Sequence, residues 1–232
     1  MTRNNEIEPP HRILVALEAE EGAAALLEAA ADLAAGLHAE LFGLFVEDSE
    51  LLGAAELPVT RSISSLAEAQ APLDARLMRR ALRVSAVRAG EALAAVAQRR
   101  RVKFSYRVVQ GALAEQVLAE ARRYDLLALG PPGREVRRAP VTVARRAVAE
   151  QAPCSVLLLQ GGGAAGRPVV VIYDGSERSL ALGERLARIT ERPLLVLAVA
   201  ENEDGVSDLV RRAKDWERRH HGRARVLGAV GE

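Results

Sequence analysis

Two carboxylates end apolar segments that occur twice in the chain. The first segment reads Arg12-Ile-Leu-Val-Ala-Leu-Glu18, and the second reads Arg167-Pro-Val-Val-Val-Ile-Tyr-Asp174-Gly-Ser176. A helix-like stretch and another apolar segment follow each of them, so we interpret both as copies of one strand–helix–strand unit. Ligands of open α/β sheets bind outside the carboxyl ends of the strands. The repeat therefore predicts a ligand site beside these carboxylates.

Residue types and spacing do not favour an enzyme. The histidines show no spacing with cysteine or carboxylate groups that would hold a metal, and the chain lacks a Walker loop, a Gly-x-Ser-x-Gly elbow and a Gly-x-Gly-x-x-Gly fingerprint. Asp174 and Ser176 have no histidine partner nearby in the sequence, which favours a helix cap over a catalytic pair. We therefore predict no catalytic residue and no bound metal.

Composition narrows the class of protein further. The chain has 232 residues, of which 49% are hydrophobic, and its formal net charge is +1. This hydrophobic fraction predicts a globular fold. A net charge so close to zero creates no overall electrostatic field that would attract nucleic acid or an anionic membrane. Cys154 is the only cysteine, and we expect a buried, inert thiol in a reducing compartment. The polar amino terminus resembles no secretion signal, so we predict a cytoplasmic location.

Strand-like and helix-like segments alternate along the chain. In the first part, strands are predicted at 13–17, 41–46, 102–109, 125–130 and 155–159, and helices at 20–37, 73–99, 112–123 and 142–150. The second part adds strands within 167–173, 193–199 and 224–230, and helices before Thr190 and over 206–220. The order predicts an α/β fold, a doubly wound parallel five-stranded sheet (Rossmann-like) plus a second, incomplete α/β unit.

Local signals add detail to these elements. Gly36 is expected to stop the first helix, and residues 48–68 to form a long loop or flap. The strand over 102–109 alternates polar and apolar residues, as a half-exposed edge strand does. The helix over 73–99 is expected to bury one apolar side and to expose its arginines. The residues assigned to its buried side are Leu77, Ala81, Val84, Val87 and Leu93.

Glycine content marks a boundary between two parts of unequal length. Gly161-Gly-Gly-Ala-Ala-Gly166 has the composition of a flexible linker. We therefore predict a domain over 12–160, a linker over 161–166 and a partial second domain over 167–232. The second part lacks the fourth and fifth strands of the first. The first strand of that part should thus expose an edge, which either the first domain or another subunit could cover. Because unpaired edges favour association, we predict a homodimer.

Four segments together resemble the universal stress protein family. They are the acidic residue that ends the first strand, the Val109-Gln-Gly111 turn, the run from Asp125 to Gly133, and Ala152-Pro-Cys-Ser-Val-Leu-Leu-Leu159. The second copy repeats the opening signature as Tyr173-Asp-Gly-Ser176. The resemblance covers nearly the whole chain from Arg12, apart from 48–68, and implies a tandem arrangement with a truncated second copy.

The resemblance implies an adenine-nucleotide site, because some family members bind ATP or a related nucleotide and others do not. In the members that bind, a strand leads into Gly-x-x-Gly, and a helix that begins with a serine or threonine follows. Glycines allow backbone amides to approach phosphate oxygens, and the helix adds its amino-terminal partial charge. Carried over to this sequence, the implied nucleotide-binding residues are Ala16, Leu17, Glu18, Val46, Leu129, Gly130, Gly133, Thr142 and Val143.

The motif differs from the family pattern at several positions. Pro131 and Pro132 remove two backbone donors, and Val141 stands where a glycine precedes the hydroxyl residue. Gly130 and Gly133 could instead form a tight turn, and Glu18 could cap a helix. The sequence thus leaves open a non-catalytic stress-response module that binds ATP and a nucleotide-independent interaction scaffold with a degenerate pocket. A phosphate-transferring enzyme lacks an evident general base or nucleophile.

Overall fold

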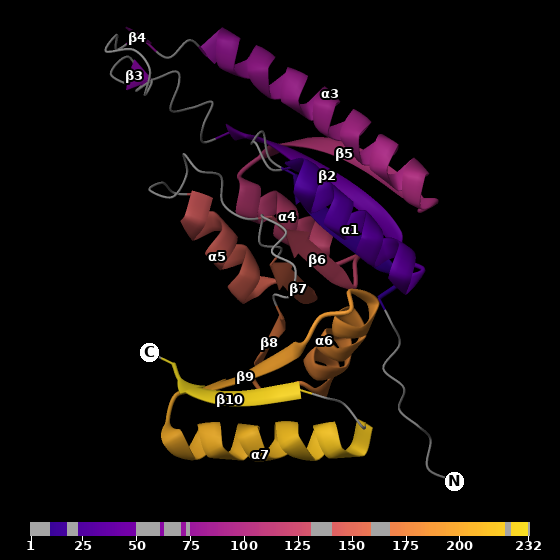
Figure 1. Cartoon of the computed structure of the whole chain (residues 1–232). Coiled ribbons are helices and arrows are strands. Elements are labelled where there is room, and N and C mark those ends of the chain that lie inside the picture. Colours follow the sequence, from indigo (N-terminus) through magenta and orange to yellow (C-terminus); the bar gives the residue numbers. More distant parts are fainter. Residues whose placement is uncertain are drawn as a thin grey trace. The chain divides into compact units, whose positions relative to one another are not determined.

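Two compact units make up the chain, one of residues 10–162 and one mainly of residues 163–232 (Figure 1). The structure, a computed structural model, describes residues 10–17, 23–49, 61–62, 71–72, 75–130, 141–158, 168–220 and 224–231. The side chains at 23, 48, 61–62, 71–72, 75 and 141–145 lie outside that description.

The larger unit contains the predicted five-stranded parallel sheet. Its strands are β1 (Arg12–Leu17), β2 (Glu40–Asp48), β5 (Phe104–Gly111), β6 (Leu126–Leu129) and β7 (Ser155–Leu158). They lie in the order β5-β2-β1-β6-β7, and every neighbouring pair is parallel. The helices are α1 (Ala23–Leu37), α3 (Ala75–Arg100), α4 (Leu113–Ala121) and α5 (Val141–Gln151). The doubly wound fold class is confirmed.

Helices cover both faces of this sheet (Figure 1). On one face, Leu14, Phe42 and Leu127 form a buried cluster with Leu113 and Val117 of α4. The helices α1 and α3 lie on the other face, where they pack against each other and against β1 and β2. Because the central strands β1 and β6 are buried on both faces, their sequences read as continuous apolar runs, whereas the edge strand β5 is largely exposed and alternates polar and apolar residues.

Gly43, in the middle of β2, sets the approach of α3 to the sheet. A Cβ atom built at this position would lie 2.5 Å from Leu93 Cδ2 of α3, 3.1 Å from Tyr106 Cδ2 and 3.3 Å from Leu17 Cδ1. Gly90 of α3 similarly lies against the ring of Tyr106, whose hydroxyl donates a 2.6 Å hydrogen bond to the carbonyl oxygen of Ala86. Glycine and alanine at this contact let the helix pack closely on the strands.

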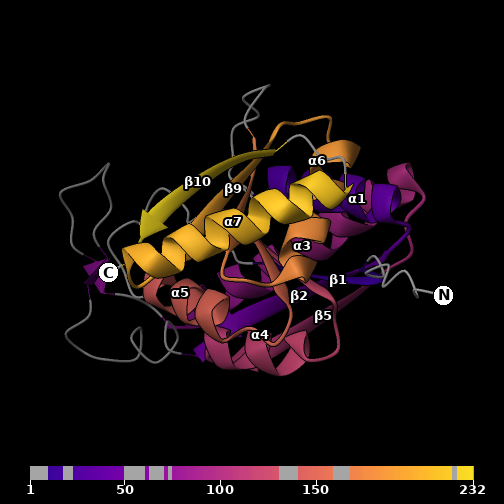
Figure 2. The ribbon, with the colours of Figure 1, turned by 90° about the horizontal axis from the view of Figure 1, so that it is seen from below.

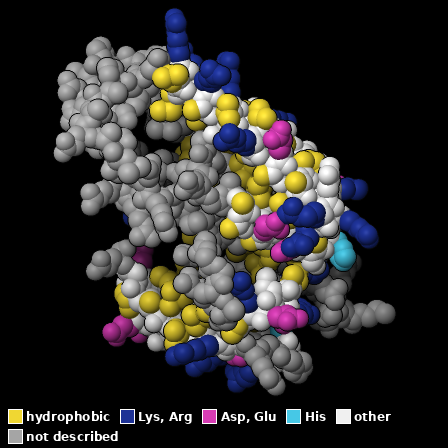
Figure 3. All heavy atoms as spheres, turned by 45° about the horizontal axis from the view of Figure 1, so that its top comes forward, with side chains coloured by type: hydrophobic (Ala, Val, Ile, Leu, Met, Phe, Trp, Pro, Cys, Tyr) yellow, Lys and Arg dark blue, Asp and Glu magenta, His cyan; other side chains and the backbone are white. Residues whose placement is uncertain are grey.

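The predicted buried side of α3 is correct at Leu93 and wrong at the other four residues. Leu77, Val84 and Val87 are 64%, 42% and 61% exposed, and Figure 3 shows hydrophobic and basic side chains mixed on this part of the surface. The residues of α3 that are buried are Leu82, Ala86, Ala89, Leu93, Val96 and Ala97. Hydropathy favoured the larger side chains, whereas three of the buried residues are alanines.

Two further local predictions need correction. The helix α1 continues through Gly36 to Leu37, and His38 takes the left-handed conformation that ends it, with a φ of 55°. The N–H groups of His38 and Ala39 then bond the carbonyl oxygens of Ala35 and Ala34. The expected loop over 48–68 contains a short strand, β3 (Arg61–Ser62), which pairs antiparallel with β4 (Ala71–Pro72). The other predicted parts of that loop lie largely outside the described residues.

The smaller unit is a three-stranded parallel sheet with helices on one face. Its elements are β8 (Val169–Tyr173), α6 (Glu177–Ile189), β9 (Leu194–Ala200), α7 (Glu203–His220) and β10 (Ala224–Val230), with strand order β10-β9-β8. Figure 2 shows α7 lying across its strands.

Both helices of the smaller unit pack on the same face of its sheet. Leu180 of α6 and Trp216 of α7 share one buried cluster with Val171, Tyr173 and Val196. Residues on the opposite face remain open to solvent, since Val170, Ile172 and Leu227 are 51%, 65% and 40% exposed. Among the described residues, this unit therefore has two layers where the larger unit has three.

Substitution of Gly43 tests the close approach of α3. We expect Gly43→Val to lower the free energy of unfolding by about 1–3 kcal/mol, because the added atoms overlap Leu93, Tyr106 and Leu17. Gly36→Ala is the matched control, because Gly36 is an exposed helical glycine and alanine there should stabilise the protein by about 0.5–1 kcal/mol. Urea unfolding measures both. A neutral Gly43→Val would contradict the packing described.

The free energy of unfolding should depend on pH through the ionisation of Tyr106. Burial, followed by the nearby charge of Glu47, raises the pKa of Tyr106 to about 12 from an unfolded value of 10.0. The folded state thus disfavours the phenolate, so the stabilisation is fully present below pH 10 and is lost as pH rises towards 12. We expect the free energy of unfolding to fall across this range, and to fall less in Tyr106→Phe. Equal slopes in both proteins would contradict the assignment.

Candidate functional site

The order of strands reverses beside β1. From β1 the chain passes through α1 to β2 on one side, whereas β6 lies on the other side and leads through α5 to β7. The register pairs Ala16 with Leu129 at the carboxyl ends of β1 and β6. In open α/β sheets this switch point is where the loops separate and leave a crevice for ligands. The predicted site falls at this edge of the sheet.

Three predicted residues come together as part of the core. Ala16, Val46 and Leu129 are 6%, 4% and 4% exposed and belong to one buried cluster beneath α4 and α5. Leu17 faces the other side of the sheet, near Gly43. Because these side chains are already packed, they could offer a ligand only the edge of an apolar floor and the backbone at the strand ends.

Gly130 directly follows β6 and has a packing role of its own. A Cβ atom at this position would lie 3.1 Å from Leu26 Cδ2 of α1, which is closer than side chains normally approach. Its backbone does not adopt the left-handed conformation that Gly111 and Gly175 adopt. The glycine thus allows α1 to approach the end of β6 at the switch point.

The other predicted site residues lie wholly or partly outside the part of the chain that the structure describes. Glu18 and Gly133 lie outside the described residues, as do Pro131 and Pro132. Thr142 and Val143 fall in the first turn of α5, which begins at Val141, but their side chains are not described. The first N–H groups of a helix lack partners within the helix and carry a partial positive charge.

An aromatic and cationic cluster at the opposite end of the sheet was not predicted. The guanidinium carbon of Arg12 lies 4.7 Å from the centre of the Tyr124 ring, which lies 5.1 Å from the ring of Phe42. The guanidinium carbon of Arg107 lies 5.6 Å from the centre of the Phe42 ring. Asp125 Oδ2 accepts the backbone N–H groups of His11 and Arg12 at 2.9 and 3.1 Å.

This cluster has a structural role, because it connects the starts of neighbouring strands. It borders a hollow of about 520 Å³ at the amino ends of β1, β2 and β5. Burial, more than any neighbouring charge, raises the pKa of Tyr124, so its hydroxyl is protonated at neutral pH. The cation–ring contacts and the Asp125 hydrogen bonds join the starts of three strands. The sequence did not allow this cluster to be predicted, because its members come from four segments that are distant from one another in the chain.

The carboxylate of Asp174 forms a local hydrogen bond just before α6. Asp174 Oδ1 accepts the backbone N–H of Ser176 at 3.2 Å, whereas Ser176, the residue that precedes the helix, makes no side-chain capping hydrogen bond. The expected helix cap is therefore not formed by either side chain, and the Asp174 bond closes a turn that leads into the helix. Gly175 between them has a φ of 111°, and its carbonyl oxygen accepts a 2.9 Å hydrogen bond from Arg212.

Three findings bear on metals, thiols and membranes. Within the described ranges, no group of three or more histidine, cysteine, aspartate or glutamate side chains could hold a metal ion. Cys154 is half-buried, less buried than expected. In the same part of the chain, no helix combines the length and apolar character needed to cross a membrane.

Comparisons with known proteins identify a family and a fold. A model of the universal stress protein family matches residues 10–160. No curated protein matches the sequence. A universal stress protein from Archaeoglobus fulgidus DSM 4304 has a similar structure, with a TM-score of 0.62 and 17% sequence identity, over 97% of this chain and 78% of that chain.

Two further solved structures are similar over almost the whole chain. A functionally unknown protein from Pseudomonas aeruginosa PAO1 gives a TM-score of 0.57 at 13% identity, covering 97% of this chain and 76% of that one. The cytoplasmic domain of a prokaryotic cation chloride cotransporter gives 0.51 at 13% identity, covering 95% and 79%. At these identities the likeness concerns the fold alone.

Proposed function

Because the chain belongs to the universal stress protein family, we propose that it is a non-catalytic regulatory module of the stress response that binds ATP or a related adenine nucleotide in its larger unit. The observation that supports this proposal most directly is the reversal of strand order at β1 and β6, with Gly130 directly after β6. Folds of this kind bind ligands at this edge, and the family resemblance implies an adenine-nucleotide site there.

Each part of the nucleotide has a candidate partner at that edge. We assign Glu18 to a ribose hydroxyl, because a carboxylate accepts such hydrogen bonds. Gly130 and Gly133, with the amino end of α5 and Thr142, are assigned to the phosphates. The apolar edge formed by Ala16, Val46 and Leu129, with Leu17 and Val143 beside it, is assigned to adenine.

Three broader features complete the proposal. We propose a domain over 12–160, a linker over 161–166 and a truncated second copy over 167–232, arranged in tandem. The similar order of strand, helix and strand in β1–α1–β2 and β8–α6–β9 supports that arrangement. A cytoplasmic location, without nucleic acid or membrane as a partner, fits the lone Cys154 and the balanced charge.

Calorimetric titration with ATP tests the site. We expect heat of binding at about hundreds of micromolar nucleotide, and an affinity lowered about tenfold in Glu18→Gln, the loss of one charge-assisted hydrogen bond. Gly130→Val should weaken binding as much or more, because its side chain covers the switch point. Gly36→Ala is the matched control and should bind as the wild type does. Absence of heat, or equal affinity in all variants, would refute the proposal.

A nucleotide-independent scaffold is the second candidate, and the open face of the smaller sheet favours it. Val170 and Ile172 of β8 are apolar and more than half exposed. Among the described residues, β8 pairs only with β9, so its other edge has unpaired backbone groups. A surface of this kind favours association between two copies of the chain.

Light scattering tests that association. We expect a dimer whose mass does not depend on ATP, and a shift towards the monomer in Ile172→Lys, because a charge would enter the apolar contact. Leu77→Lys is the matched control, since Leu77 is an equally exposed apolar residue of the larger unit. A monomeric mass at every concentration would rule out the homodimer.

A further inference from the structure

The strand β10 ends the smaller sheet with a free edge. Within the described residues it pairs only with β9, along its whole length from Ala224 to Val230. Exposed edges are usually protected by prolines, bulges or several charged residues. The sequence of β10, Ala-Arg-Val-Leu-Gly-Ala-Val, has one charged residue and no proline. Its backbone is therefore available to a further strand.

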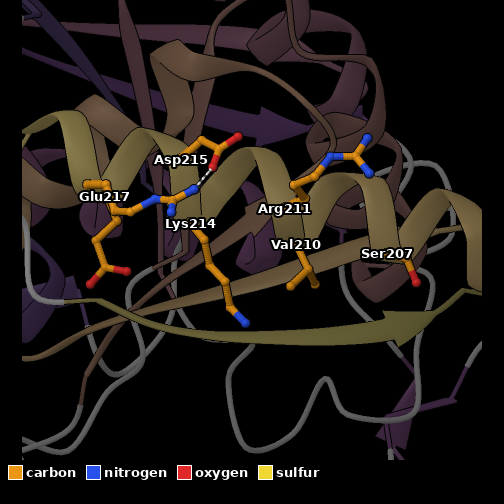
Figure 4. A pocket seen from close by; sticks show the side chains of 7 residues that line it. Ser207, Val210, Arg211, Lys214, Asp215 and Glu217 are labelled. Carbon is orange, nitrogen blue, oxygen red and sulfur yellow. Dashed lines mark hydrogen bonds and ion pairs between the residues drawn. The ribbon is translucent and has the colours of Figure 1, made fainter.

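The helix α7 packs beside this edge. A Cβ atom at Gly228 of β10 would contact Val206 and Val210, and Glu217 Oε1 accepts the N–H of Ala224 at 2.9 Å. A hollow of about 470 Å³ follows the exposed flank of the helix. Figure 4 shows the side chains of Val210 and Lys214 extending from α7 towards β10.

Two cations beside the edge lack a partner in the described part of the chain. Arg211 pairs with Asp208, and Arg218 pairs with Asp215. The amino group of Lys214 and the guanidinium group of Arg225 form no such ion pair among the residues described. Lys214 lies on the α7 side of the sheet. Arg225 alternates with Ala224 and Val226, which pack towards the helices, and so lies on the opposite side.

We propose that β10 and the flank of α7 bind an extended, acidic peptide segment of a partner protein, which adds a strand to the sheet. Successive side chains of an added strand point to opposite faces. One acidic side chain would then meet Lys214, and its neighbour would meet Arg225. Leu227 and Val230, which are 40% and 53% exposed, provide apolar contacts along the same strand. Backbone hydrogen bonds supply affinity, and the two cations supply selection for acidic residues.

Charge argues against a second copy of this chain as the occupant. Two β10 strands paired across a two-fold axis would bring two Lys214 and two Arg225 side chains to one shared edge. No carboxylate of β10 itself would compensate them. Like charges at cross-strand positions destabilise pairing, so a foreign acidic strand fits this edge better than the same strand does.

A labelled peptide tests the proposal. The probe is a fluorescein-labelled Thr-Val-Thr-Glu-Glu-Val-Thr-Val peptide, in which the adjacent glutamates point to opposite faces. We expect fluorescence anisotropy to show saturable binding, and deuterium uptake of residues 224–230 to fall when the peptide binds. The double substitution Lys214→Glu with Arg225→Glu should weaken binding about tenfold, since two exposed ion pairs become repulsive.

Two controls distinguish binding at this site from a general attraction between opposite charges. Arg178→Glu removes an exposed cation from α6, which packs on β8 at the other edge, and should leave the affinity unchanged. The same peptide with lysines in place of its glutamates should bind at least tenfold more weakly. ATP should not alter either result, so a failure here differs from a failure of the nucleotide site.

Three results with the peptide would overturn the proposal. They are no binding, binding without protection of residues 224–230, and equal affinity in the double variant and the wild type. Protection of the same residues that rises with protein concentration in the absence of peptide would also overturn it, because that result would assign the edge to a second copy.

Discussion

The central strand β1 imposes the main constraint on the larger unit. Its residues from Ile13 to Leu17 are at most 6% exposed, and strands lie on both of its edges. A backbone so deeply buried must have its N–H and C=O groups paired, and the parallel neighbours β2 and β6 provide those pairs. Helices must then cover both faces, and the connections on either side of β1 must diverge. This divergence is the reason for placing the proposed nucleotide site at the carboxyl end of β1.

Small residues set the distance between the layers. Gly43 and Gly90 accommodate Leu93 and Tyr106 where α3 meets the strands, and Gly130 accommodates Leu26 where α1 meets the end of β6. Gly130 thus has two explanations that do not compete. Close packing of α1 favours a residue without a side chain, and the proposed phosphate contact uses a glycine at the same position. Its presence alone does not distinguish a nucleotide-binding member of the family from one without a ligand.

Sequence patterns were sufficient for the sheet and insufficient for the surfaces of helices. Buried parallel strands are short apolar runs, and their alternation with helices led to the correct five-stranded and three-stranded sheets. Most of the buried side of α3 was misassigned, because hydropathy ranks Leu77 above Ala86, whereas Ala86 is buried and accepts the hydrogen bond of Tyr106. The end of α1 at Leu37 was predicted correctly, but the residue that ends it is His38 and not Gly36, because a histidine adopts the conformation that glycine usually supplies. At the candidate site, the strand ends at Leu17 and Leu129 were predictable from the pattern, whereas Glu18 and Gly133 lie outside the described residues.

The single helix layer of the smaller unit affects how the two units should withstand heat. A sheet covered on one face shields fewer apolar side chains from water than a sheet covered on both, and Val170 and Ile172 illustrate the difference. Hydrophobic stabilisation per residue is therefore lower in this unit. On warming, the smaller unit should melt before the larger one and give two separate transitions. A ligand that covered the open face would bring the two transitions closer together.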